Sequence, residues 1–242
     1  MAILTVLPGG RDPKPFSMSA RGVAKFMIAS PYAARKVVES YAFPREDRAP
    51  KMRPAPAKEI VWNYFRSGRD RSVLETAIAQ HEVVPSGEKG FGKGRRRQAL
   101  AVAQHLKNLD AKLDLRDVRR ARDMHMSIAG LSVRASVDFL CRTLDDKVTA
   151  VVVNVAAEVS DHKDRLEHYA LIESEIAWRI TRIAMPEVEQ ILYIDAPSEK
   201  VFRPHLTAHK GAWRNIETTC DNIMIAYRII LARHDLRRRS EG

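Results

Sequence analysis

The sequence contains little cysteine, no long apolar run and no recognisable leader, and each shortage removes a class of protein. Two cysteines, Cys141 and Cys220, are too few for a disulfide framework or a four-cysteine zinc or iron–sulfur site, so we expect a reducing compartment. The most apolar run, residues 148–159, is about half the ~20 residues that a membrane-spanning helix requires. The N-terminal residues lack the basic region and cleavage site of a signal peptide. We therefore expect a cytoplasmic protein that does not enter a membrane.

Basic residues outnumber acidic ones, and the excess lies in one half of the chain. The 242 residues include 41 Lys and Arg against 30 Asp and Glu, a formal net charge of +11. Residues 1–125 contain 25 basic and 13 acidic residues, whereas residues 126–242 contain 16 and 17. Neutralising phosphates releases condensed counterions, so a localised excess of this kind favours a polyphosphate partner. The alternative is a high isoelectric point that reflects only the composition of a basic proteome.

Apolar periodicity predicts helices in the first half of the chain and strands with helices in the second. The predicted helices are 19–40 with a break at Pro31, 57–65, 72–81, 98–113, 163–183 and 213–234. The predicted strands are 125–135, 136–143, 148–155, 190–194 and 200–203. This order predicts an α/β fold with a central mixed β-sheet flanked by helices and an N-terminal helical region.

Two irregular segments divide the chain. Residues 41–56 hold four prolines, so we place an N-terminal arm, helix and Pro-rich loop at 1–56 and the α/β domain at 57–242, including the C-terminal helix. Residues 82–97 form a basic loop with four glycines, either simply exposed or facing phosphates. The Walker spacing is absent there because Gly92-Lys93 is followed by Gly94, so we reject a nucleotide-binding loop.

An aspartate lies within the second of the three predicted strands in the middle of the chain. Asp138 belongs to the apolar segment 130–140, and Asn154 and Ala156 end the strand that follows the turn at 145–147. This arrangement resembles the PD-(D/E)XK nuclease superfamily, in particular its RecB-like branch. In that family the second strand carries an acid, any residue and a lysine, and the next helix carries Q-x-x-x-Y, here residues 165–169. The resemblance covers roughly residues 57–232 by order of elements and roughly 128–196 by motif.

The resemblance implies a restriction-endonuclease-like fold and a metal-dependent site. In the family, acids on neighbouring strands hold one or two Mg²⁺ or Mn²⁺ ions, which polarise the scissile phosphate and lower the pKa of a water molecule. The lysine orients that water. Asp138 matches the first metal ligand, and Tyr169 matches the tyrosine of the helix motif.

The second motif departs from the family pattern. Asn154 stands at the acid position and Ala156 at the lysine position, which implies weak metal affinity and slow hydrolysis. Glu158, or Glu173 or Glu175 from the helix, is the candidate replacement acid, and Lys147 or Lys163 is the candidate lysine. The candidate catalytic residues are therefore Asp138, Asn154, Glu158 and Tyr169, with Asp138 and Glu158 as metal ligands.

Basic residues around the polar loop are the candidate nucleic-acid contacts. Arg95, Arg96 and Arg97 stand at the start of a predicted helix, where positive charge opposes the helix dipole, so phosphate explains them better than helix stability does. Aromatic residues make up only 7% of the chain, which leaves few for stacking on bases. The predicted phosphate contacts are Arg66, Arg69, Arg71, Lys89, Lys93, Arg95, Arg96 and Arg97.

Two further candidate site features also have simple structural explanations. Glu75 is either an additional acid of the site or part of a solvated helix face. His205 and His209 have the spacing of a metal-binding pair on a helix, but Pro204 places them in a loop.

Three functions follow as hypotheses. The first is a DNA-binding protein with a RecB-like fold and an impaired active site, acting with other protein subunits in a DNA-processing or defence assembly and needing no cofactor. The second is an active Mg²⁺- or Mn²⁺-dependent DNA nuclease that uses Asp138 and Glu158. The third is a non-enzymatic interaction subunit whose charge attracts an acidic protein.

Overall fold

The computed structural model describes residues 16–44, 56–87, 90–156, 163–204 and 210–240. The helices are α1 (Ala20–Ile28), α2 (Pro31–Ala42), α3 (Pro56–Arg66), α4 (Arg71–Glu82), α5 (Phe91–Leu109), α7 (Lys163–Ala184) and α8 (Lys210–Ser240), with a 3₁₀ turn at Asp110–Lys112. The strands are β1 (Ser17–Ser19), β2 (Arg116–Arg120), β3 (Met124–Ile128), β4 (Leu131–Ala135), β5 (Phe139–Arg142), β6 (Val148–Asn154), β7 (Gln190–Asp195) and β8 (Lys200–Phe202).

A five-stranded mixed sheet forms the centre, in the order β2-β5-β6-β7-β8. Strands β5 and β6 are an antiparallel hairpin, whereas β6 and β7 are parallel and are connected through α7. The run of β-branched residues in β6 is buried on both faces, as expected for a central strand. This topology confirms the predicted fold class, a restriction-endonuclease-like α/β fold with a central mixed sheet between helices.

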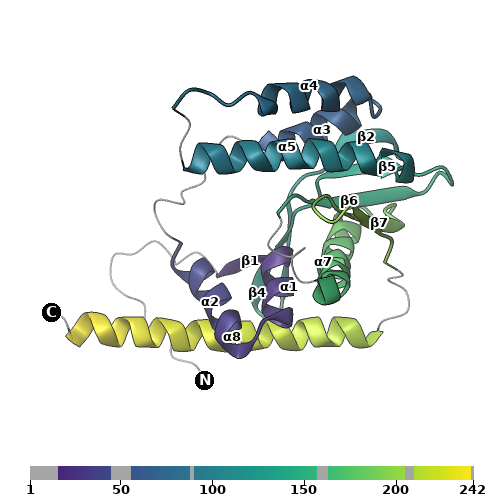
Figure 1. Ribbon diagram of the computed structural model, residues 1–242. Helices are drawn as coiled ribbons and strands as arrows, with labels where there is room; N and C mark the ends of the chain where they lie inside the picture. Colours follow the sequence, from purple (N-terminus) through teal and green to yellow (C-terminus); the bar gives the residue numbers. More distant parts are fainter. Residues whose placement is uncertain (1–15, 45–55, 88–89, 157–162, 205–209, 241–242) are drawn as a thin grey trace, which may run out of the picture.

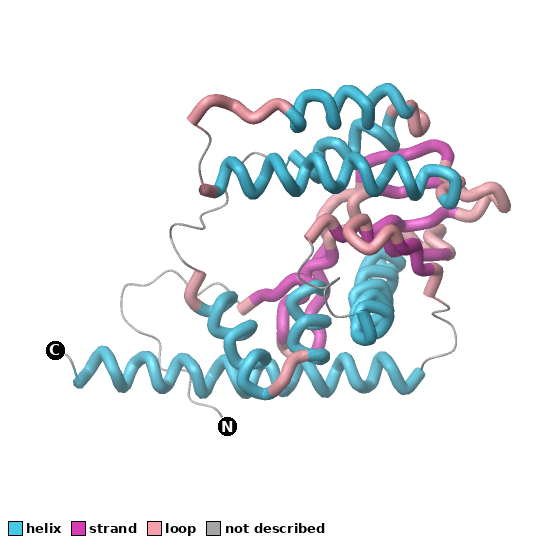
Figure 2. The backbone as a smooth tube through the Cα atoms, in the orientation of Figure 1, coloured by secondary structure: helices cyan, strands magenta, loops and turns pink. Residues whose placement is uncertain are grey.

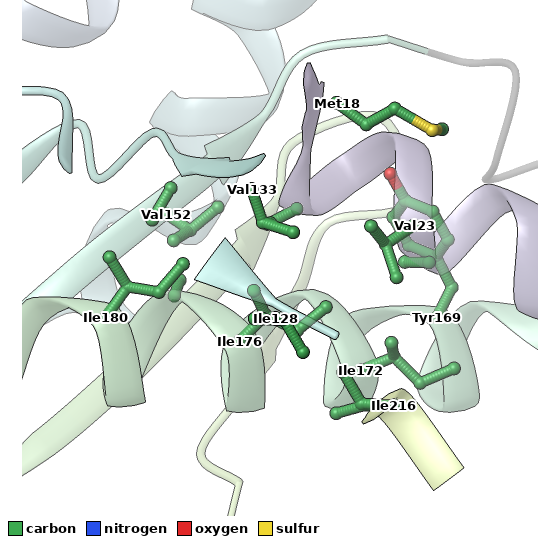
Figure 3. Close-up of a cluster of buried hydrophobic side chains, with 14 of the residues drawn as sticks. Met18, Val23, Ile128, Val133, Val152, Tyr169, Ile172, Ile176, Ile180 and Ile216 are labelled. Atoms are coloured by element: carbon green, nitrogen blue, oxygen red, sulfur yellow. The ribbon is translucent and has the colours of Figure 1, made fainter. Parts of the chain in front are cut away.

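Helices cover both faces of the central sheet. In Figure 1, α3, α4 and α5 lie on one side, and α7 lies on the other with the second sheet and α8 beyond it; Figure 2 shows the same layers. Side chains of β6 alternate between the two cores, since Val151 and Val153 pack with the α3–α5 layer and Val152 packs with α7. Figure 3 shows Val152 beside Ile176 and Ile180. The alternation therefore decides which side chains of β6 face each helix layer.

The second sheet is a correction to the sequence prediction. Residues 125–135 are predicted as one strand of the central sheet, but they form a hairpin of two strands, β3 and β4, in a separate three-stranded sheet in which β1 pairs parallel with β4. The hairpin turns at Ala129 and Gly130, which both have positive φ, 48° and 81°. Strands β1 and β2 were not predicted at all, because three residues or a run of arginines gives no alternating apolar pattern.

The predicted helices are present, but several of their ends differ; α8, predicted over residues 213–234, spans Lys210–Ser240. Helix α2 restarts at Pro31, with the Ser30 hydroxyl accepting a hydrogen bond from the Ala33 N–H. Helix α5 begins at Phe91 rather than Gln98, so the second half of the predicted basic loop is helical. Gly90, with φ 55°, makes the turn into this helix, and Arg96 donates to the last-turn carbonyl of His81 in α4. No helix of the described ranges is both long and apolar enough to cross a membrane.

The two N-terminal helices share a core with the C-terminal half. Val23 and Val38 are completely buried and belong to the same apolar cluster as Tyr169 and Ile223 of α7 and α8. The boundary predicted at residues 56 and 57 stays a prediction.

Candidate active site

Asp138 is fixed against the end of β6. It lies immediately before β5, and its N–H donates to the Val151 carbonyl at 2.9 Å. Its carboxylate atom Oδ2 accepts a hydrogen bond of 2.7 Å from the Val153 N–H. The structure therefore brings Asp138 to Val153, the residue before Asn154, near the end of β6 where the sequence motif predicts the site.

Lys58, which the sequence analysis missed, supplies the positive charge at this edge. It stands in the first turn of α3, and its ammonium Nζ lies 2.6 Å from Asp138 Oδ1 and 2.5 Å from the Val153 carbonyl oxygen. The side chains of Lys58 and Asp138 are 30% and 19% exposed, so the pair is partly shielded from water. A single lysine 80 positions before Asp138 carries no motif, so only the packing of α3 could identify it.

Asn154 is part of a buried polar link between the two parallel strands. Its Nδ2 donates to Asp195 Oδ1 at 2.5 Å and to the Ala156 carbonyl at 3.0 Å, and its Oδ1 accepts from the Ala156 N–H at 3.1 Å. Asp195 Oδ2 accepts from the Ser198 N–H at 3.1 Å. Both Asn154 and Asp195 are completely buried. An amide is therefore the residue that position 154 requires, since a carboxylate there would meet Asp195 as a like charge.

Asp195 is a second residue that the sequence analysis did not select. The signal was present, because Asp195 ends β7 and the carboxyl ends of parallel strands meet at one edge of a sheet. Gln98 of α5 completes this edge by donating from Nε2 to the Val155 carbonyl at 2.8 Å.

Tyr169 lies in a buried cluster behind the carboxylate. Arg21 Nε donates to Glu173 Oε1 at 3.3 Å, and the Tyr193 hydroxyl donates to Glu173 Oε2 at 3.2 Å. Burial and the charge of Glu173 raise the pKa of Tyr169 and of Tyr193. Burial disfavours the charge of Arg21, but the carboxylates of Glu173 and, more weakly, Asp138 raise its pKa above the ordinary value. Tyr169 thus belongs to the core beside the site, as a neutral phenol.

The described residues do not fit a divalent cation. Both oxygens of Asp138 already accept hydrogen bonds, and one of the donors is an ammonium whose charge would repel a metal ion. Asn154 has its oxygen engaged by Ala156. Within the described part of the chain, no three His, Cys, Asp or Glu side chains form a metal-binding group. Glu158 and the histidine pair at 205 and 209 lie outside the described residues.

The other candidate acids and lysines lie elsewhere. Lys147 pairs with Asp145 at 2.9 Å in the hairpin turn, at the far end of β6 from Asn154, about 20 Å away for a strand of this length. Glu75 pairs with Lys107 at 3.1 Å, between α4 and α5, and Glu175 pairs with Arg179 within α7 at 2.6 Å. Lys147 therefore lies too far from Asn154 to supply the lysine, and the assignment of the acid to Glu75 or Glu175 stays a prediction.

The predicted phosphate contacts that the structure describes lie in two groups. Arg69 and Arg71 lie beside Asp110 at the C-terminal end of α5, with Arg71 Nε 2.9 Å from Asp110 Oδ2, and Arg66 is exposed nearby at the end of α3. Lys93, Arg95, Arg96 and Arg97 lie in the first two turns of α5, at the end where Gln98 reaches β6. The α5 helix of 19 residues separates the groups by about 20 Å. Lys89 lies outside the described residues.

No family model matches the sequence, and no curated protein matches it. The chain is similar to the crystal structure of an alkaline exonuclease from Laribacter hongkongensis, with 11% sequence identity, a TM-score of 0.43, and coverage of 94% of this chain and 96% of that chain. It is also similar to a putative exonuclease from Eubacterium rectale, with 13% identity, a TM-score of 0.48, and coverage of 88% and 82%.

Proposed function

We propose that this protein binds DNA through a RecB-like PD-(D/E)XK fold whose active site no longer cleaves. The observation that carries the proposal is the ammonium of Lys58, which bridges Asp138 Oδ1 and the Val153 carbonyl. A carboxylate and a carbonyl oxygen are the ligands that a hard cation such as Mg²⁺ takes. A fixed, singly charged ammonium at these atoms balances Asp138 without any metal ion.

The chemistry of hydrolysis is missing from the described site. Cleavage in this family needs a cation that polarises the phosphate and activates water. An ammonium held by two acceptors neither binds water as a strong Lewis acid nor exposes a base. With Asn154 engaged by Asp195 and with alanine at position 156, no described group takes over either task.

Support for DNA as the partner comes from the distribution of charge. The basic excess belongs entirely to residues 1–125. Lys93 and Arg97 are exposed on the first two turns of α5, at the end of the helix layer that reaches β6. Exposed cations of this kind make phosphate contacts that are independent of base sequence. The protein would act in the cytoplasm with other subunits and without a cofactor.

DNA retention and DNA cleavage, measured on the same full-length protein, test the proposal. Wild-type protein should retain plasmid and single-stranded DNA, with affinity falling by about a hundredfold or more between 50 and 200 mM salt. It should leave both substrates uncut in Mg²⁺ or Mn²⁺. Cleavage that disappears in Asp138→Ala would establish the active nuclease that uses Asp138 and Glu158, with Mg²⁺ or Mn²⁺. Failure to retain DNA even at low salt would favour the interaction subunit.

A further inference from the structure

Helix α8 has two apolar faces on opposite sides. The first face is buried in the molecule through Ile216, Ile223 and Ile230. Two ring stacks extend this face: Tyr227 on Phe16, with centroids 3.9 Å apart, and His234 on Phe43, at 4.5 Å. Figure 1 shows α8 along one side of the molecule, with α1, α2 and β4 packed against it.

The second face is exposed and follows a heptad spacing. Ile225, Ile229, Ala232 and Leu236 are separated by four, three and four residues, which aligns them along one stripe. Ile225, Ile229 and Leu236 are 46%, 48% and 66% exposed. At 100° per residue, this outer stripe lies about 180° from the buried face. A helix that needed only one apolar face would carry polar residues here.

The charges beside the outer stripe are self-complementary. Arg228 and Asp235 are exposed, seven residues apart, and lie on the same flank of the stripe. Neither forms an ion pair within the described part of the chain. Two antiparallel copies of a helix related by a two-fold axis present the same flank to each other. Arg228 of one copy would then face Asp235 of the other, and the contact would occur twice.

We propose that the outer stripe of α8 is the interface for a second copy of this chain, in an antiparallel helix pair. Ile229 packs opposite Ala232 across the two-fold axis, and Ile225 packs opposite Leu236. Parallel pairing is disfavoured because it would place Arg228 against Arg233 of the partner. The stripe covers about three turns, so the dimer is a weak one that forms with rising concentration.

Sedimentation of the full chain without DNA tests the proposal independently of the proposed function. Wild-type protein should pass from monomer to dimer between about 1 and about 300 µM. Ile229→Glu should remain monomeric over the whole range, because it places a carboxylate in the apolar seam. Leu236→Glu, at the most exposed of the three large apolar side chains, is a second seam variant that should have little effect on folding. Circular dichroism checks that both variants are folded.

A charge exchange tests the antiparallel register. Arg228→Asp alone and Asp235→Arg alone should each weaken the dimer about tenfold, because each puts like charges together twice. The double variant Arg228→Asp/Asp235→Arg should restore wild-type dimerisation. A double variant no better than the single ones would overturn the antiparallel arrangement. A wild-type protein that stays monomeric throughout, or an Ile229→Glu variant that still dimerises, would overturn the interface and leave the stripe to a different protein.

Discussion

An aspartate lies at each end of the helix layer formed by α3, α4 and α5, and the two aspartates have different hydrogen-bond partners. At the far end, Asp110 accepts hydrogen bonds from the Tyr64 hydroxyl and from Arg71, with Arg69 beside it. At the site end, Asp138 is held by one lysine and one backbone N–H. The far end is a structural clamp built from three side chains. The site end has the position of a catalytic centre but uses the same kind of internal pairing, which teaches that a cation next to an acid is not by itself a sign of chemistry.

The largest effect is expected at the buried link behind Asp138. Asn154→Asp places two carboxylates in contact in a fully buried position and should lower the free energy of unfolding by about 3 to 5 kcal/mol at neutral pH. Urea denaturation measures the loss. The exchange variant Asn154→Asp/Asp195→Asn keeps one amide and one carboxylate and should recover most of the stability. Equal loss in both variants would show that the pairing of charge is not the cause.

Removing Lys58 tests how the site end differs from the far end. Lys58→Ala leaves Asp138 Oδ1 and the Val153 carbonyl without their donor and should cost about 1 to 3 kcal/mol. Because the freed oxygens suit a hard cation, millimolar Mg²⁺ or Mn²⁺ should raise the melting temperature of this variant and leave the wild type unchanged. Lys107→Ala, which removes an exposed partner of Glu75, is the matched control. A metal-dependent shift in the wild type would contradict the role of Lys58.

The contribution of Asp110 to the stability of the far end should depend on pH. Burial disfavours the charge of Asp110, but hydrogen bonds from Tyr64 and Arg71 hold its pKa below the ordinary value. Its contribution to stability is therefore complete above the unfolded pKa of about 3.9 and is lost as the pH falls through the lowered folded value. Asp110→Asn should be less stable than wild type by about 1 to 2 kcal/mol at pH 7. That difference should shrink below about pH 4; a difference independent of pH would exclude the charge as its cause.

The smallest effect concerns DNA affinity. If phosphate contact belongs to the site end, Lys93→Ala/Arg97→Ala should reduce the slope of log affinity against log salt by about 2, with stability unchanged. Arg66→Ala removes an exposed arginine at the far end and should leave the slope unchanged. Equal reductions would show that both groups of basic residues contact phosphate. A fluorescence anisotropy titration at several salt concentrations gives both slopes.

The sequence predicted the elements with strong periodicity and the neighbours that strand geometry imposes. The β-branched residues of β6 predicted a central strand, and the motif predicted that Asp138 lies near its end, where the Val153 N–H donates to the carboxylate. The sequence could not predict Lys58, because its role depends on how α3 packs across the sheet edge and not on any spacing. The sequence also could not show that Arg71 and Arg97 have different surroundings. Arg71 pairs with Asp110, which is distant in sequence and is brought near only by the fold. Contacts between residues that are distant in sequence and belong to no motif can be found only from the fold.

The parallel pairing of β1 with β4 imposes an order on biosynthesis. Ser17 of β1 is among the first described residues, yet its partner is Ser132. During translation, the first strand and the α1 helix that follows it must wait until more than half of the chain has left the ribosome. The β3–β4 and β5–β6 hairpins, whose partners are close in sequence, can close as soon as they emerge. β1 is therefore added to a sheet whose β3–β4 hairpin is already formed.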